Sequence, residues 1–185
     1  MSVDYSDALK CHYVRTWESQ PVENRWVLGR PHELPTDFSV LEFAPTMSRA
    51  AWVYATSCMS QPSDTIGIEL HLFSPIRSDT HVELLTAICH FHRTCSHLDL
   101  GHTVNFGRPW LDQSLCSYGL ISLPYIDGPE IKHFRHADGL TRCLWLLPIT
   151  PLERDFKRYS GPEALEQLFE RVQVDYLDPN RSCVI

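Results

Sequence analysis

The sequence predicts an α+β fold: a single domain in which helices flank a mixed, largely antiparallel sheet. Strand-like apolar runs gather in the middle of the chain, and helical patterns occur at its start, centre and end. That segregation is typical of the α+β class. No repeat, low-complexity block or linker divides the 185 residues, a length that suits one domain with a sizeable core. We therefore assign residues 1–185 to one domain.

The first half of the chain predicts one helix and three strands. Residues 4–17 favour a helix, because a thin stripe shares one side: Tyr5, Leu9, His12 and Tyr13. Residues 21–37 contain three prolines and are expected to connect elements. Strands are expected at 38–43, 50–56 and 66–73. The last is the clearest, because Ile66, Ile68, Leu70 and Leu72 alternate with Glu69 and His71 on the other face. The turn at 57–64 predicts an antiparallel hairpin.

A central helix is predicted from residue 80 to about residue 94. Thr80 and Glu83 have the spacing of a capping box at its start. Its expected buried stripe is Val82, Leu85, Ile88 and Cys89. A turn into a short strand follows at 100–104, then a polar loop at 105–116 and a strand at 119–125. Residues 131–139 show no clear pattern.

The C-terminal stretch predicts a strand at 141–147 and two helices. Thr150 and Glu153 form a capping box with Pro151 at the first helical position. Ser160 and Glu163 suggest a second capping box. The second helix is expected to bury Leu165, Leu168, Phe169 and Val172, and to end at Asp178-Pro179.

Composition excludes several classes of function. The chain is 43% hydrophobic and 21% charged, with a net charge of −7, which argues against nucleic-acid binding because phosphates require clustered cations. No run of about 18 apolar residues predicts a membrane span. The start of the chain shows no secretory leader. Seven irregularly spaced cysteines are therefore expected to be free thiols, which predicts a cytoplasmic protein.

Six motifs occur in a fixed order over about residues 52–181. They are Trp52 with YATS and MS, the run IELH at 68–71, LGHTV at 100–104 with Gly107, LPY at 123–125, LWLLPIT at 144–150, and GPEALEQLF at 161–169. In this order they resemble the Suppressor of fused domain family. Its eukaryotic members have two lobes and bind a transcription factor. This chain is similar to the N-terminal lobe alone and thus resembles the stand-alone bacterial type.

The resemblance implies a non-catalytic protein-interaction domain without a cofactor. Stand-alone members are often proposed to be immunity proteins that neutralise a toxin. An acidic inhibitor would associate faster with a basic partner through electrostatic steering. One departure from the family pattern is Cys58, where a small residue, usually glycine, is expected. If that turn requires a positive φ, a cysteine is strained there.

Two alternatives to a binding domain are open. A thiol- or serine-dependent hydrolase would use Ser57, Cys58 or Ser60 with His71 or His102, although no G-x-S-x-G motif is present. A metal site would come from the densest ligand cluster: Cys89, His90, His92, Cys95, His97 and His102. These spacings match no common zinc site, so we predict no metal.

The partner-binding surface is expected on a loop, because loop residues need not satisfy packing. Residues 105–117 form the longest loop after the first fifty residues. It carries Trp110, a potential aromatic anchor, among Arg108, Asp112 and Gln113. Asp127 and Glu130 in the next turn would add acidic character. The opposing expectation is that Trp110 covers the edge of the core.

Overall fold

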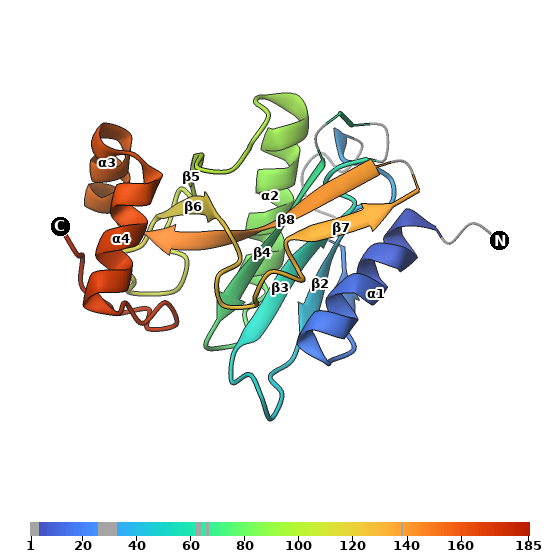
Figure 1. The fold of residues 1–185 in the computed structure, drawn as a ribbon, viewed down its shortest axis with the longest axis horizontal. Coiled ribbons are helices and arrows are strands. Elements are labelled where there is room, and N and C mark those ends of the chain that lie inside the picture. The colour runs from blue at the N-terminus through green and yellow to red at the C-terminus, as the bar shows by residue number, and fades with distance from the viewer. Residues whose placement is uncertain (1–3, 26–32, 62–63, 66, 138) are drawn as a thin grey trace. The chain divides into compact units, whose positions relative to one another are not determined.

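Each predicted strand and helix has a counterpart in the computed structural model, which describes residues 4–25, 33–61, 64–65, 67–137 and 139–185 (Figure 1). The chain divides into two compact units. Unit 1 contains residues 1–99 and 123–145, and unit 2 contains residues 100–122 and 146–185. The strand order is β1-β2-β3-β4-β8-β6-β5, with β7 also paired to β8. The fold is therefore α+β, as predicted.

Unit 1 is built on an antiparallel meander. It runs through β1 (Val22–Asn24), β2 (Ser39–Phe43), β3 (Trp52–Ser57) and β4 (Gly67–Ser74). The predicted hairpin is thus confirmed. β8 (Gly139–Ile149) pairs with β4 in parallel, which makes the sheet mixed, and β7 (His133–His136) pairs with β8 antiparallel. Residue 66, which the sequence assigns to the strand that became β4, lies outside the described residues.

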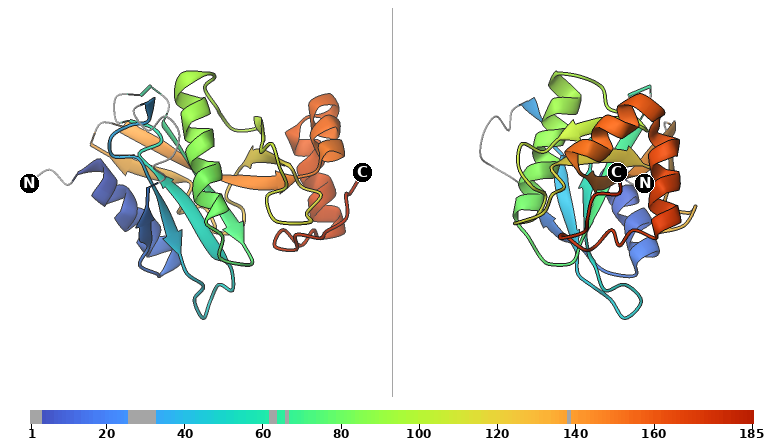
Figure 2. Two further views of the ribbon diagram at one scale, coloured as in Figure 1. Left: turned by 180° about the vertical axis from the view of Figure 1, so that it is seen from behind. Right: turned by 90° about the vertical axis from the view of Figure 1, so that its left-hand side faces the viewer.

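Two helices cover opposite faces of the unit 1 sheet (Figures 1 and 2). The ring of Trp17 in α1 (Tyr5–Trp17) lies 4.7 Å from Phe43 and 5.5 Å from His71. On the other face, His81 in α2 (Thr80–Thr94) lies 5.0 Å from Tyr54. Every residue of β4 is consequently buried. The strict alternation of this strand correctly predicts its two faces, and both faces are covered.

Unit 2 consists of β5 (Thr103–Asn105), β6 (Tyr118–Ser122), the end of β8, α3 (Pro151–Ser160) and α4 (Pro162–Val172). Gly119 allows close packing, because a Cβ there would lie 2.6 Å from atoms of both Leu146 and Phe106. The Tyr118 ring lies 4.3 Å from the guanidinium carbon of Arg154 in α3. α3 and α4 pack against each other, as the orange and red helices of Figure 1 show.

The helix boundaries confirm some of the capping predictions and correct others. Thr150 and Glu153 form the predicted capping box. The capping box predicted at Thr80 is wrong, because Asp79 is the N-cap of α2 and Thr80 is already its first residue. The Thr80 hydroxyl instead pairs with the Ser78 hydroxyl at 2.7 Å. The box at Ser160 is also wrong, because Ser160 is still the last residue of α3.

The end of α4 also differs from the prediction. The helix stops at Val172 rather than at Asp178, because Gln173 adopts a left-handed conformation with φ 52°. Val174 then donates its N–H to the carbonyl of Phe169 at 3.0 Å, which closes the helix end. Leu165 and Phe169 are buried as expected, whereas Val172 is 54% exposed. The expectation that Val172 belongs to the core is therefore wrong.

Candidate functional site

The buried carboxylate of Glu69 organises the hairpin end of unit 1. The β3–β4 pairing ends at Ala55 and His71. Beyond this pair, side-chain oxygens rather than the partner strand form hydrogen bonds with the backbone. Glu69 accepts hydrogen bonds from the Thr56 hydroxyl at 2.5 Å and from the backbone N–H groups of Met59 and Ser60, each at 3.2 Å. The side chain therefore satisfies the buried backbone donors of the turn.

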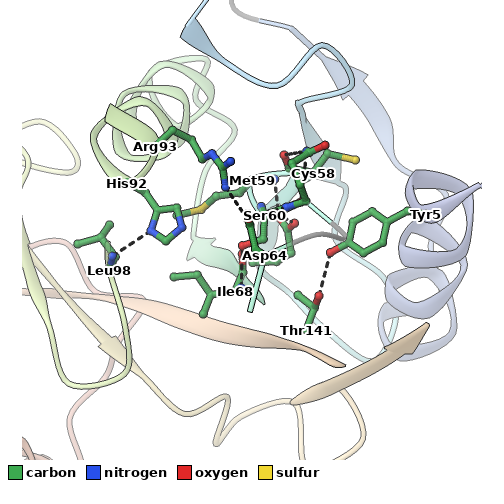
Figure 3. A network of polar contacts seen from close by, with 12 residues as sticks. Tyr5, Cys58, Met59, Ser60, Asp64, Ile68, His92, Arg93, Leu98 and Thr141 are labelled. Carbon is green, nitrogen blue, oxygen red and sulfur yellow. Dashed lines mark hydrogen bonds and ion pairs between the residues drawn. The ribbon is translucent and has the colours of Figure 1, made fainter. Parts of the chain in front are cut away.

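The neighbouring backbone groups are satisfied by hydroxyls in the same way. The Ser60 hydroxyl donates to the carbonyl of Ile68 and accepts from its N–H, each at 2.8 Å. Leu70 donates its N–H to the Thr56 hydroxyl at 2.8 Å. Figure 3 shows Ser60 beside Ile68 in this network, and Tyr5 of α1 pointing to Thr141, at 3.0 Å from its hydroxyl. The network ties the turn to β4.

No cation lies within hydrogen-bonding distance of the Glu69 carboxylate among the described residues. Complete burial raises the pKa of Glu69 to about 7, although hydrogen bonds from Thr56, Ser60 and Met59 oppose the rise. Cys58, in the same turn, has φ 65°, so this position does require the left-handed conformation in which glycine is expected. Burial also raises the pKa of the Cys58 thiol to about 11.

These contacts do not favour the hydrolase alternative. A thiol with a raised pKa is a poor nucleophile at neutral pH. The hydroxyl of Ser57 lies 3.4 Å from that of Ser6 and 3.8 Å from the Cys58 sulfur. The Ser60 hydroxyl is committed to the backbone of Ile68. In the described part of the chain, none of the three candidate nucleophiles is hydrogen-bonded to a histidine.

Asp127 is an internal anchor rather than an exposed acidic residue. Its side chain is 5% exposed, and its Oδ1 accepts a hydrogen bond from Trp17 Nε1 at 2.8 Å. His71 Nε2 lies 3.1 Å from its Oδ2, although the two groups are not aligned for a hydrogen bond. The carboxylate therefore joins the turn after β6 to α1 and to β4.

A polar hollow of about 720 Å³ lies between α1, this turn and β7. We call it the α1–β7 hollow; its walls include Arg15, Thr16, Asp127, Glu130, His133 and Arg135. It therefore contains two of the residues predicted from the sequence, Asp127 and Glu130. Next to it is a smaller apolar pocket of about 280 Å³, the Pro129 pocket, lined by Leu123, Pro124, Tyr125, Gly128, Pro129 and Lys132. Pro129 lines both hollows.

The predicted loop at 105–117 lies in unit 2 and presents Arg108, Asp112 and Gln113 to solvent. Trp110 differs from them: it is 3% exposed, and its Nε1 donates to the Ser114 hydroxyl at 2.9 Å. The Ser114 hydroxyl also accepts from the N–H of Cys116 at 3.1 Å. Trp110 thus stabilises the loop from within, and the residues Arg108, Asp112 and Gln113 around it are exposed.

The Cys/His cluster does not converge on a metal geometry. Within the described residues, no group of three or more Cys, His, Asp or Glu side chains is arranged to hold a metal ion. Cys89 is fully buried in α2. His92 Nδ1 accepts the N–H of Leu98 at 2.9 Å, and burial lowers the pKa of His92 to about 4. His92 therefore fixes the end of α2 as a neutral acceptor.

Unit 2 contains a second buried carboxylate, Glu153 of α3. Arg181 donates to both of its oxygens, at 2.7 and 2.8 Å, and Thr150 donates its N–H at 2.8 Å. Burial alone would raise the pKa of Glu153, but the hydrogen bonds and charge of Arg181 outweigh it and the pKa is lowered. Arg181 also donates to the carbonyl of Pro148 at 3.1 Å, so this pair fixes the C-terminal segment to the end of β8.

Comparison with known proteins identifies the family. The family model described as Suppressor of fused protein (SUFU) matches residues 35–182. The chain belongs to the Suppressor of fused family. A protein from Neisseria gonorrhoeae FA 1090, described as a Suppressor of fused homolog, superposes with a TM-score of 0.87 at 35% sequence identity, covering 98% of this chain and 97% of that one. This is the bacterial relationship that the six motifs predict.

Two more distant Suppressor of fused structures share the fold at 15% identity. A chain solved in the Sufu–Fu complex has a TM-score of 0.71, with coverage of 100% of this chain and 93% of that one. Drosophila Suppressor of Fused has a TM-score of 0.66, and the match covers 99% of this chain but 52% of that one. No curated protein sequence is significantly similar to the chain. No helix in the described residues is long and apolar enough to cross a membrane.

Several residues of the Suppressor of fused pattern lie in the two buried networks, whereas the motif residues Leu123, Pro124 and Tyr125 line the Pro129 pocket. Met59, Ser60 and Glu69 build the first network, and Thr150 belongs to the second. Sequence reasoning missed Arg15 and Arg135, because they lie 120 positions apart and become neighbours of one hollow only through the packing of α1 against β7.

Proposed function

We propose that this chain is a non-catalytic protein-binding member of the Suppressor of fused family, and that its partner is a toxin which it neutralises as an immunity protein. The observation that carries the proposal is the commitment of its reactive groups to the fold. Glu69, Ser60 and Glu153 all bind backbone groups of the chain itself. What is left for function is surface recognition. The similar chain in the structure described as the Sufu–Fu complex supports protein binding as an activity of this fold.

The loop at 105–117 is the first contact surface that we propose. Its exposed residues Arg108, Asp112 and Gln113 are polar groups of the kind found at interface rims. The buried Trp110 stabilises the loop that carries them. The nearby Leu115 is 60% exposed and adds apolar area. Because the loop is held by the Trp110–Ser114 contact, its binding would lose little conformational entropy.

Co-expression with candidate toxins tests the proposed function. Each toxin candidate encoded beside this gene is expressed with and without the chain in a sensitive host. The expected result is restored growth with one candidate, together with co-purification of that candidate and this chain. Absence of both rescue and binding for every neighbouring candidate would overturn the immunity function.

The loop is tested separately with the partner found in that assay. The Arg108→Ala/Asp112→Ala variant is expected to weaken binding by about 1–2 kcal/mol, with little change in the melting temperature because both side chains are exposed. The exposed Arg171→Ala/Asp175→Ala pair is the matched control. Equal affinities of the two variants would remove the loop from the interface while leaving the binding function intact.

A further inference from the structure

We infer that the α1–β7 hollow and the Pro129 pocket together form a docking site for an acidic segment of the partner protein that carries one apolar side chain. This inference rests on the proposed protein-binding function and specifies the chemistry of the partner. It concerns unit 1 alone, and all residues that carry it lie in that unit.

The cations in the α1–β7 hollow lack the carboxylate partners that several other arginines of the chain have. Arg77, Arg93 and Arg142 are each paired with a carboxylate. Arg15 and Arg135 are exposed, line the hollow from α1 and β7, and have no ion pair within the described residues. A guanidinium group binds a carboxylate through two parallel hydrogen bonds. Two such groups on two elements that line one hollow favour a segment with carboxylates.

The local charge has the opposite sign to that of the whole chain. Arg15, Arg135 and Lys132 outnumber the two carboxylates of the lining, Glu130 and Asp127, and the Asp127 side chain is only 5% exposed. The net charge of −7 governs the long-range approach of a partner. The groups in the hollows determine which chemistry is bound at contact range.

The Pro129 pocket supplies the apolar part of the site. Its walls are Leu123, Pro124, Tyr125 and Pro129, with Lys132 at one side. Tyr125 and Ile126 are 60% and 53% exposed, so the turn beside the pocket has apolar surface that a partner can cover. Because Pro129 lines both hollows, a short segment can place one apolar side chain in the pocket and its carboxylates beside the arginines.

The turn between the two hollows is fixed before any partner binds. Trp17 holds Asp127 at 2.8 Å, and His12 Nε2 lies 2.9 Å from the carbonyl of Ile131. Burial lowers the pKa of His12, so the imidazole is neutral at pH 7 and donates this hydrogen bond. A preorganised turn avoids part of the entropic cost of binding.

Selection from a random peptide display library on the purified, full-length chain tests the inference. The expected result is enrichment of short peptides that combine Asp or Glu with one aromatic or large aliphatic residue. Their affinity is then measured on an Arg15→Glu/Arg135→Glu variant and on an Arg158→Glu/Arg171→Glu variant. The control reverses two exposed arginines outside the hollows and has the same net charge. We expect about tenfold or greater weakening in the first variant only.

The outcomes separate this inference from the proposed function. Enrichment of basic or uncharged peptides, no enrichment, or equal weakening in both variants would overturn the docking site. Self-association of the wild-type chain that the Arg15→Glu/Arg135→Glu variant abolishes would do the same, because the occupant would be a second copy. If the toxin partner binds the variant as tightly as the wild type, the binding function stands and the site does not. Circular dichroism confirms that each variant is folded.

Discussion

Replacing Glu69 with glutamine is expected to remove a pH dependence of stability that originates in the interior of unit 1. The carboxyl group is fully buried, and its pKa is raised from 4.5 to about 7, mainly by burial. A carboxyl whose pKa is raised on folding binds more protons in the folded state than in the unfolded state. The contribution of Glu69 to the free energy of unfolding therefore falls as pH rises from 4.5 through about 7.

The size of the effect follows from the two pKa values. Each tenfold change in proton affinity corresponds to about 1.4 kcal/mol, so the wild type should lose about 2–3 kcal/mol between pH 5 and 8 through Glu69 alone. Glutamine cannot ionise. Its amide NH₂ does face a donor, such as the N–H of Met59 or Ser60, and this conflict should cost about 1–3 kcal/mol at low pH. The variant is therefore less stable at pH 5 and comparable to the wild type at pH 8.

The decisive quantity is the difference between the two proteins. Burial lowers the pKa of His92 to about 4 and also lowers that of His12, so these groups make stability rise with pH in the same range. They cancel part of the Glu69 effect in the wild type but are common to both proteins. Urea unfolding at pH 5, 6, 7 and 8 measures the free-energy gap. Glu170→Gln, at an exposed site, is the matched control. A gap for Glu69→Gln that stays constant from pH 5 to 8 would refute the reasoning.

Four further substitutions test other parts of the structure. Arg181→Met should destabilise the chain by about 3–5 kcal/mol in chemical unfolding at pH 7, because it leaves the Glu153 carboxylate buried without a cation. Since the pKa of Glu153 is lowered, the stability from this pair should be lost as pH falls below 4.5. A loss at neutral pH no larger than in Arg158→Met would contradict this prediction. Cys58→Gly should be about 1 kcal/mol more stable than Cys58→Ala, because φ is 65° there; the reverse order in thermal unfolding would show that the turn is relaxed. Trp110→Ala should cost about 3 kcal/mol of stability because the ring is 3% exposed, and a binding defect without a stability loss would make Trp110 a contact residue instead. Asp127→Asn should cost about 1–3 kcal/mol, with the Trp17 fluorescence altered, and unchanged values of both would show that the Trp17–Asp127–His71 contact is dispensable.

The elements of the fold were predictable where local signals agree. The alternation at 66–73 gives the faces of β4, and Thr150, Pro151 and Glu153 give the start of α3. The predictions failed where two local signals compete. At Ser160 the capping pattern is present, but Pro162 disfavours a helical conformation at the residue before it, and Gly161 supplies the break with φ 92°. Ser160 is thus the last residue of α3, and Gly161 rather than Ser160 is the N-cap of α4.

The candidate surfaces were predictable only in part, because hollows depend on distant segments. The loop at 105–117 is continuous in sequence, so its exposed residues Arg108 and Asp112 could be named in advance. For Trp110 the sequence left two expectations open, a binding anchor and a cover over the edge of the core, because the choice depends on Ser114 turning back toward the indole. Asp127 has the sequence context of an exposed turn residue, yet Trp17 and His71 enclose it. The α1–β7 hollow needs α1 and β7 together, and residues 131–139 gave no strand signal.

The burial of several motif residues explains why family resemblance predicts the fold of this chain more directly than its partner. A side chain that satisfies buried backbone groups cannot also contact a partner. Glu69 and Ser60 replace a strand ladder, and in the LGHTV motif Gly101 donates its N–H to the carbonyl of Ile121 at 2.8 Å. Arg15, Arg135, Arg108 and Asp112 lie outside the motifs. If the two proposed surfaces bind the partner, exchange of exposed residues on α1, β7 and the 105–117 loop would alter partner specificity while leaving both buried carboxylate networks of this chain intact.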